Sequence, residues 1–229
     1  MAEFTVGVVG GLGPETSAKF YTRVVSDVYK TTKKQPNIVI DNVPISAADV
    51  EEVSRTPSER IYSILESSVR RLAAIPADLI VIPCNTVHIY FERLQKITDV
   101  PILNIIDETA REVKRLGFTK AGVIATTTTV ASGLYQRSFA KAGIAPVFPH
   151  EIDQLEITAI VTRILDHSDT PRDALFLNEV ADKLAAGGAK AVVLGCTDLQ
   201  LLIKEHKKAV IVDSMESLAK GTVEQILER

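Results

Sequence analysis

The chain contains two cysteines, Cys84 and Cys196, in similar local sequences. The first lies in residues 83–88, which read PCNTVH, and the second in residues 195–198, which read GCTD. Both cysteines follow a short apolar run, and a helical pattern begins after Cys84. A thiol at a helix start faces unpaired backbone N–H groups and the positive end of the helix dipole, which favour the thiolate. Because an unperturbed thiol has a pKa of ~8.5, a modest reduction gives a base that works near neutral pH.

Simpler explanations exist for each thiol taken alone. A lone cysteine is more often a small buried hydrophobe than a catalyst. A disulfide is disfavoured because so few cysteines are typical of a reducing compartment. The four histidines are scattered, and only Cys84 and His88 have the i,i+4 spacing of helical metal ligands. We therefore predict no metal site, and we expect His88 to pack behind the reacting groups.

Two thiols that face each other across a cleft suit one class of reaction. One thiolate removes a proton from a carbon stereocentre, and the opposite thiol delivers a proton to the other face. Amides and hydroxyls near both cysteines would stabilise the carbanion-like intermediate, without a metal or a redox cofactor. The residues that offer such groups are Asn85, Thr86, Thr126, Thr127 and Thr197.

Short β-branched runs alternate with longer amphipathic patterns along the chain. The runs that predict strands are 5–9, 37–43, 79–82, 121–125, 191–194 and 210–212. The patterns that predict helices are 58–73, 109–116, 154–165 and 174–186. Several runs are apolar at nearly every position, as in parallel strands covered on both faces. The alternation predicts an α/β fold with mainly parallel sheets.

The sequence repeats one plan twice. Gly7 and Gly122 occupy similar strand patterns 115 residues apart, and the two cysteines are 112 residues apart. Although apolar strands can match by coincidence, two landmarks with nearly one offset indicate two similar halves related by pseudo-symmetry.

We predict a first domain of residues 1–103 plus 210–229 and a second domain of residues 104–209. The last strand and helix would fit either half on sequence alone. Ligands of open α/β sheets bind beyond the carboxyl ends of the strands, so the site is expected in the cleft between the two domains.

Two further loops lie at predicted strand ends. Residues 10–14 read GGLGP, and their glycines allow a close backbone approach to a ligand or simply connect a strand to a helix. The loop lacks the third glycine of a dinucleotide fingerprint, where Thr16 stands, and it lacks the lysine of a phosphate-binding Walker loop. One hydroxyl of residues 126–129 is expected to cap a helix.

Composition excludes several classes of protein. The chain has 229 residues, 46% hydrophobic and 24% charged, with a net charge of −3, so a disordered chain and a nucleic-acid partner are both disfavoured. No apolar run is long enough to cross a membrane, and the first residues do not resemble an export signal. We expect a cytoplasmic protein.

These motifs resemble those of the cofactor-independent aspartate/glutamate racemase family, and aspartate racemases in particular. The resemblance rests on GGLGP at 10–14, PCNT at 83–86 with His88, ATT at 125–127 and GCTD at 195–198. It implies two pseudo-symmetric α/β domains, no pyridoxal phosphate and a homodimer. It also implies that Cys84 and Cys196 are the acid/base pair and that His88 and Asp198 support them. The positions that it implies for substrate binding are Gly11, Leu12, Asn85, Thr86, Thr126, Thr127, Thr129 and Thr197.

The sequence departs from this family at its charged positions. Aspartate racemases carry an arginine where residues 44–49 have none, and a lysine in the second half where Arg163 stands near acidic residues. Arg55 and Arg60 are the substitutes that the sequence offers. The first hypothesis is therefore an amino-acid racemase for aspartate or glutamate. The alternatives are a hydantoin racemase, a maleate isomerase or a malonate decarboxylase of the same superfamily, or a non-catalytic protein that binds a small ligand.

Overall fold

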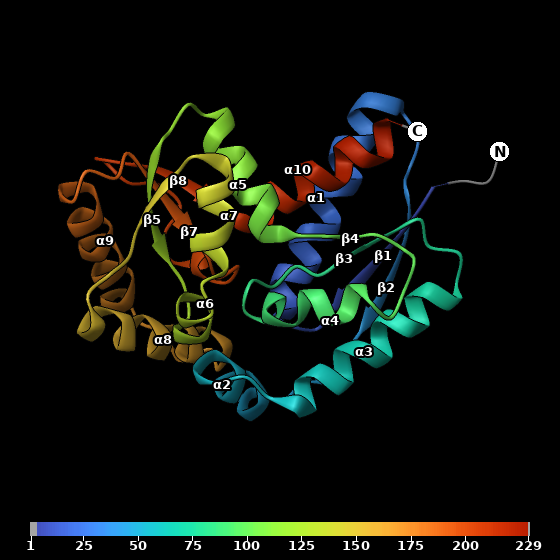
Figure 1. Ribbon diagram of the computed structural model, residues 1–229, viewed down its shortest axis with the longest axis horizontal. Helices are drawn as coiled ribbons and strands as arrows, with labels where there is room; N and C mark the ends of the chain where they lie inside the picture. The colour runs from blue at the N-terminus through green and yellow to red at the C-terminus, as the bar shows by residue number, and fades with distance from the viewer. Residues whose placement is uncertain (1–3, 229) are drawn as a thin grey trace.

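The computed structural model describes residues 4–228, which form two four-stranded parallel sheets flanked by helices (Figure 1). The first sheet has the order β2-β1-β3-β4 and the second has the order β6-β5-β7-β8. The strands of the first sheet are β1 (Thr5–Gly10), β2 (Asn37–Asn42), β3 (Leu79–Val81) and β4 (Ile102–Leu103). Those of the second sheet are β5 (Lys120–Ile124), β6 (Ala145–Val147), β7 (Ala191–Leu194) and β8 (Val210–Asp213).

Helices connect these strands in both halves. Those of the first half are α1 (Pro14–Thr32), α2 (Ala47–Arg55), α3 (Glu59–Ala74), the short 3₁₀ helix η1 (Thr86–Tyr90), α4 (Phe91–Gln95) and α5 (Ile105–Arg115). Those of the second half are α6 (Thr127–Ala131), α7 (Leu134–Ala142), α8 (Glu151–Leu165), α9 (Pro171–Ala186), the 3₁₀ helix η2 (Leu199–Leu201) and α10 (Ser214–Leu227).

The predicted α/β class and the pseudo-symmetry of the halves are confirmed. Every strand pair is parallel, and the two sheets have the same order when β1 to β4 are matched with β5 to β8. The six predicted strands are all present. The sequence patterns missed β4, which spans only two residues, and β6, in which Pro146 interrupts a run of three.

Matching helix caps follow the last strand of each sheet. The Asn104 side chain accepts hydrogen bonds from two backbone N–H groups in the first turn of α5, and the Asp213 side chain does the same in α10. Such caps satisfy donors that a helix start leaves unpaired. The Asn104 cap explains why α5 begins at Ile105, four residues before the predicted start.

Each sheet is covered on both faces. The side chains of Val6 and Val8 in β1, and of Ala121 and Val123 in β5, join one core between the halves. The opposite face of the first sheet packs on α3, and that of the second sheet packs on α8 and α9. The two sheets therefore share their inner core and have separate outer ones.

The helices α5 and α10 are exchanged between the halves. Helix α5 follows the first sheet but packs against α7 of the second half, whereas α10 follows the second sheet but packs against α1. Figure 1 shows α10 lying alongside α1. The prediction placed 210–229 in the first domain; within this segment β8 pairs with β7 in the second sheet, and α10 contacts the first half. The domain bounds themselves stay a prediction.

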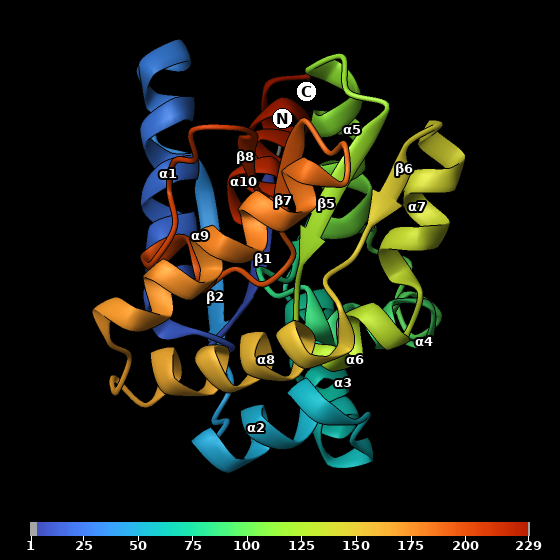
Figure 2. The ribbon, with the colours of Figure 1, turned by 90° about the vertical axis from the view of Figure 1, so that its left-hand side faces the viewer.

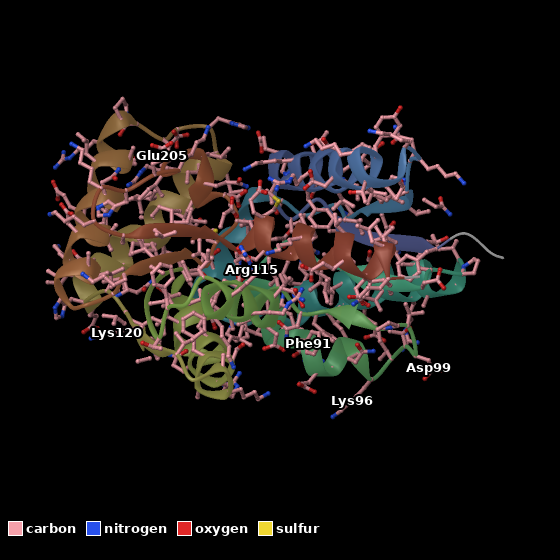
Figure 3. All side chains as sticks on the ribbon, turned by 90° about the horizontal axis from the view of Figure 1, so that it is seen from above. Phe91, Lys96, Asp99, Arg115, Lys120 and Glu205 are labelled. Carbon is pink, nitrogen blue, oxygen red and sulfur yellow. The ribbon has the colours of Figure 1, made fainter. Side chains whose placement is uncertain are left out.

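A further helix of the first half reaches the second. Helix α2 contacts α6 and α8, and Figure 2 shows it beneath α8. In the view from above, side chains fill the region between the halves; Lys120 lies in the second half, and Lys96 and Asp99 lie in the first (Figure 3). The shared inner core and the contacts of α2 with α6 and α8 thus hold the two halves together.

The repeated glycines Gly7 and Gly122 allow helices to approach the outer faces of the sheets. A Cβ at Gly122 would lie 2.9 Å from the Cβ and Cδ1 atoms of Leu184, and one at Gly7 would lie 3.2 Å from the Cβ of Leu72. We expect Gly122→Ala to lower the free energy of unfolding by about 1–3 kcal/mol through overpacking. Gly7→Ala should cost less, because its contact is looser. Urea unfolding of both variants checks the order, and the reverse ranking would contradict it.

Candidate active site

The two cysteines follow equivalent strands of the two sheets. Cys84 comes three residues after the end of β3, and Cys196 comes two residues after the end of β7. Both are free thiols; Cys84 is partly exposed and Cys196 is 6% exposed. Each is followed by a 3₁₀ helix, η1 or η2, rather than by an α-helix directly.

The two cysteine loops meet between the halves. The hydroxyl of Thr197, the residue after Cys196, donates a hydrogen bond to the carbonyl of Pro83, the residue before Cys84, at 3.4 Å. A negative charge on Cys84 raises the pKa of Cys196, so the thiols are electrostatically coupled. The structure therefore brings together the pair that the sequence singled out.

Each sulfur atom faces backbone N–H groups at equivalent positions of its own loop. The N–H groups of Thr86 and Val87 bond to Cys84, those of Asp198 and Leu199 bond to Cys196, and each lowers the pKa of its thiol. This is the predicted effect of a helix start. Burial nevertheless has the larger effect: it raises the pKa of Cys84 to about 11 and raises that of Cys196 as well. The expectation of a lowered thiol pKa was therefore wrong.

Asp198 is the charged neighbour of both thiols, and its negative charge adds to their raised pKa values. Burial raises the pKa of Asp198 itself to about 6. Its carboxylate accepts a hydrogen bond from the Thr16 hydroxyl at 2.7 Å. A Cβ at Gly13 would lie 2.8 Å from the same Asp198 oxygen, so the glycine loop of the first half closes against it. In the sequence, Thr16 was noted only because it stands where a dinucleotide-binding fingerprint has its third glycine; its contact with Asp198 was not predicted.

A buried cluster of three hydroxyls joins the halves beside Cys84. The Oγ1 atoms of Thr86 and Thr126 are 3.0 Å apart, those of Thr126 and Thr129 are 2.9 Å apart, and that of Thr129 donates to Thr86 at 3.3 Å. Thr126 is also the N-cap of α6, which was the simpler explanation for one of these threonines. The structure thus brings together three predicted substrate-binding residues.

Thr127 lies slightly apart from this cluster. Its hydroxyl is 2.9 Å from the hydroxyl of Thr158, which also accepts a hydrogen bond from the Thr127 N–H at 3.1 Å. Thr127 lines a cavity of about 1180 Å³ beside α8 and α9, which Arg55 of α2 also lines. Neither cysteine lines this cavity.

Asn85 uses both ends of its amide inside the protein. Its carbonyl oxygen accepts a hydrogen bond from the Tyr135 hydroxyl at 2.7 Å, and its NH₂ group donates to Ser214 at 2.8 Å. Sequence reasoning missed Tyr135 and Ser214 because both are remote in the chain and lie in no recognisable motif.

The glycine loop is shaped by backbone contacts. Gly11 has φ 89°, and a Cβ there would lie 2.5 Å from the carbonyl oxygen of Val43, so this turn needs a glycine. Its N–H donates to the Ser17 hydroxyl at 3.2 Å. Leu12 is buried in the outer core of the first half. A substrate-binding role for Gly11 and Leu12 stays a prediction.

The His88 side chain connects the Cys84 loop to the start of α5 by two hydrogen bonds. Its Nε2 accepts a hydrogen bond from the Ile105 N–H, so Nδ1 carries the proton and donates to the Cys84 carbonyl at 2.7 Å. The ring stacks on Phe91 and is 2% exposed. Burial lowers the pKa of His88 to about 4, which keeps the imidazole neutral. These contacts match the supporting position that the sequence predicted.

The arginines that might replace the family's substrate-binding cations are all paired. The pairs are Arg55 with Glu51 at 3.3 Å, Arg60 with Asp49 at 2.7 Å, and Arg163 with Glu156 and Asp173, both at 2.6 Å.

Within residues 4–228 no helix is long and apolar enough to cross a membrane, and no cluster of three or more histidine, cysteine or acidic side chains is arranged for a metal ion.

Comparison with known proteins agrees with this two-lobed architecture. Residues 9–222 match the model of the Asp/Glu/Hydantoin racemase family. The chain belongs to this family.

Similar proteins cover almost the whole chain. The broad specificity amino-acid racemase RacX of Bacillus subtilis is 25% identical over 226 residues, 97% of this chain and 98% of RacX. The aspartate racemase of Picrophilus torridus has a TM-score of 0.80 and 24% identity, covering 97% of this chain and 94% of its own. An aspartate racemase homologue from Pyrococcus horikoshii OT3 has a TM-score of 0.77 and 24% identity, covering 97% and 99%. The two solved structures therefore share the fold of this chain.

The neutral, buried His88 should make folding sensitive to acid. Its pKa in the folded protein, about 4, lies below the ordinary histidine value of 6.5, so the unfolded chain binds the extra proton first as pH falls. His88 should thus contribute to stability above pH 6.5, and that contribution, on the order of 3 kcal/mol, should be lost between pH 6.5 and 4.

Urea unfolding between pH 4 and 7 tests this expectation. We expect His88→Gln to lose stability less steeply with acid than the wild type, whereas the exposed-residue control His150→Gln should follow the wild type. Equal slopes for His88→Gln and the wild type would contradict it.

Proposed function

We propose that this protein is a cofactor-independent amino-acid racemase that interconverts L and D enantiomers with Cys84 and Cys196 as its two bases. The observation that carries the proposal is the meeting of two equivalent loops from separate sheets, joined by the contact between Thr197 and Pro83. Each loop presents a free thiol with two backbone N–H groups bonded to it. On the family resemblance, we also propose a cytoplasmic homodimer.

The reaction moves one proton off and one proton onto the α-carbon. The thiolate of one cysteine takes the α-proton, and the electron pair left on carbon spreads into the substrate carboxylate. The opposite thiol then protonates the other face and becomes the new thiolate. The roles of the two cysteines swap for the opposite enantiomer, and no net proton is gained or lost.

The raised thiol pKa values bear directly on this mechanism. A thiol with a pKa of about 11 is mostly protonated at neutral pH, so the resting protein is a weak base. An α-ammonium group that enters beside the thiols brings a positive charge, which favours the thiolate. We infer that substrate binding itself supplies part of the activation, while the bonded N–H groups stabilise the negative charge on sulfur.

Aspartate is our first candidate substrate and glutamate our second, on the strength of the resemblance. The resemblance points to the hydroxyls of Thr86, Thr126, Thr129 and Thr197 as ligands of the α-carboxylate, which would have to replace the hydrogen bonds that these hydroxyls make inside the protein. The loop at Gly11 and Leu12 would bound the site on the side of the first half.

One observation favours a second candidate function. Arg55, Arg60 and Arg163 are each bonded to carboxylates of the protein, so a side-chain carboxylate of a substrate would compete with these pairs. A substrate without a second acid group avoids that competition. A racemase for neutral amino acids or hydantoins, or another reaction of the same family, is the alternative, and a chiral screen that includes acidic, neutral and basic amino acids and hydantoins separates these possibilities.

The two-base mechanism predicts a distinctive result for the single cysteine variants. Cys84→Ala and Cys196→Ala should each lower racemisation by about 10²–10⁴-fold, because one proton transfer loses its catalyst. Each variant keeps one base, so in heavy water each should still exchange the α-hydrogen of one enantiomer, and the two variants should act on opposite enantiomers. Chiral chromatography with mass spectrometry measures both quantities. A double variant with full activity would exclude the mechanism.

Asp198 is predicted to set the pH dependence. Above about pH 6 it is negatively charged and raises the pKa of both thiols. Asp198→Asn removes that charge but keeps an acceptor for Thr16. The acidic limb of the kcat/KM profile should therefore move to lower pH, and the two profiles should converge below pH 6. A shift of the limb to higher pH would show that Asp198 favours the thiolate instead.

A further inference from the structure

The Asn85 side chain is the centre of a buried hydrogen-bond chain that runs between the two cysteine loops. The Tyr135 hydroxyl donates to the Asn85 carbonyl oxygen at 2.7 Å, and the Asn85 NH₂ group donates to the Ser214 hydroxyl at 2.8 Å. The Ser214 hydroxyl then donates to the carbonyl of Leu194 at 2.7 Å. Every donor and acceptor in this chain has a consistent direction.

Two members of the hydrogen-bond chain lie close in sequence to the two proposed bases. Asn85 directly follows Cys84, and Leu194 is the last residue of β7, two positions before Cys196. Tyr135 belongs to α7, and Ser214 is the first residue of α10. Two hydrogen bonds, through Ser214, thus connect the residue before η1 with the end of β7, and a third bond ties the same residue to α7.

These groups are sealed from solvent. Asn85, Tyr135, Ser214 and Leu194 are all at most 1% exposed. Burial raises the pKa of Tyr135, so its hydroxyl stays protonated and remains a donor. A buried polar group that loses its hydrogen-bond partner lowers the stability of the folded protein. The hydrogen bonds of Asn85 and Ser214 therefore allow little displacement of either cysteine loop.

We propose that Asn85, Tyr135 and Ser214 are positioning residues that hold Cys84 at the correct place relative to Cys196. This inference rests on the proposed two-base reaction. Acid and base groups on opposite faces of one carbon must both be aligned, and a misplacement of about 1 Å can cost about 100-fold in rate.

The test uses variants that each remove one hydroxyl. In Tyr135→Phe and Ser214→Ala, kcat should fall by about 10- to 100-fold, while KM changes by less than about threefold. The matched controls are Tyr90→Phe, which removes another buried tyrosine hydroxyl, bonded to Ser58, and Ser217→Ala, one turn along α10. Both controls should keep the wild-type kcat.

Two further readouts distinguish positioning from a general loss of structure. Tyr135→Phe combined with Ser214→Ala should be no worse than the more damaging single variant, because both act through Asn85. In heavy water, the variants should still deprotonate the substrate but deliver a proton poorly to the opposite face. The abstracted hydrogen then exchanges with solvent on the first thiol and returns to the same face, so deuterium in recovered substrate should rise relative to inverted product.

The possible outcomes separate the inference from the proposed function. If the wild type racemises no compound in the screen, the proposed function fails and the positioning role fails with it. If the wild type is active and the variants match their controls in kcat, or raise KM at unchanged kcat, the positioning role alone is wrong. If Ser214→Ala does not fold by circular dichroism, Tyr135→Phe decides the question, since it removes a single oxygen atom.

Discussion

The proposed reaction depends on one constraint: two thiols on separate sheets must keep a fixed relation without a covalent bond between them. Both sulfur atoms sit just beyond the ends of equivalent strands, and the strands are embedded in one core that the two halves share. Packing of this kind resists relative movement because side chains interdigitate at high density. Short polar links, from Thr197 to Pro83 and among the threonines around Thr126, then fix the finer alignment.

Electrostatics at the centre is a balance between opposing effects. Backbone N–H groups at the starts of η1 and η2 favour the thiolates, whereas burial and Asp198 oppose them. The opposing effects prevail, so both thiols are mostly protonated at neutral pH. Such thiols are poor nucleophiles, since the thiolate is the reactive form, and this protects them from oxidation.

The sequence contained most of the fold. Hydrophobic runs such as 191–194 are complete strands, and the offset between Gly7 and Gly122 revealed the repeat, because both glycines meet the same packing requirement under a helix. Strands β4 and β6 were not predictable from pattern, since two residues carry no period and a central proline argues against a strand. The crossing of α10 to the first half depends on tertiary packing, which sequence spacing does not encode.

The candidate site, like the fold, was predictable from the sequence only in part. Cys84 and Cys196 were identified because their motifs are local and repeated. The partners of Asn85 were not, because Tyr135 and Ser214 lie 50 and 129 residues away in the chain and meet it only in the folded protein. The direction of the thiol pKa shift was predicted wrongly because local sequence indicates a helix start but not the depth of burial around it.

The exchanged helices have a consequence for how the chain folds. Neither half contains all the surfaces that cover its own sheet: a fragment ending near residue 116 would lack α10, and the remaining fragment would lack α5. Each fragment would leave part of the shared core open to water, so neither is a self-sufficient folding unit. The two lobes should therefore gain their stability in one cooperative transition, even though the polypeptide contains the same architectural unit twice.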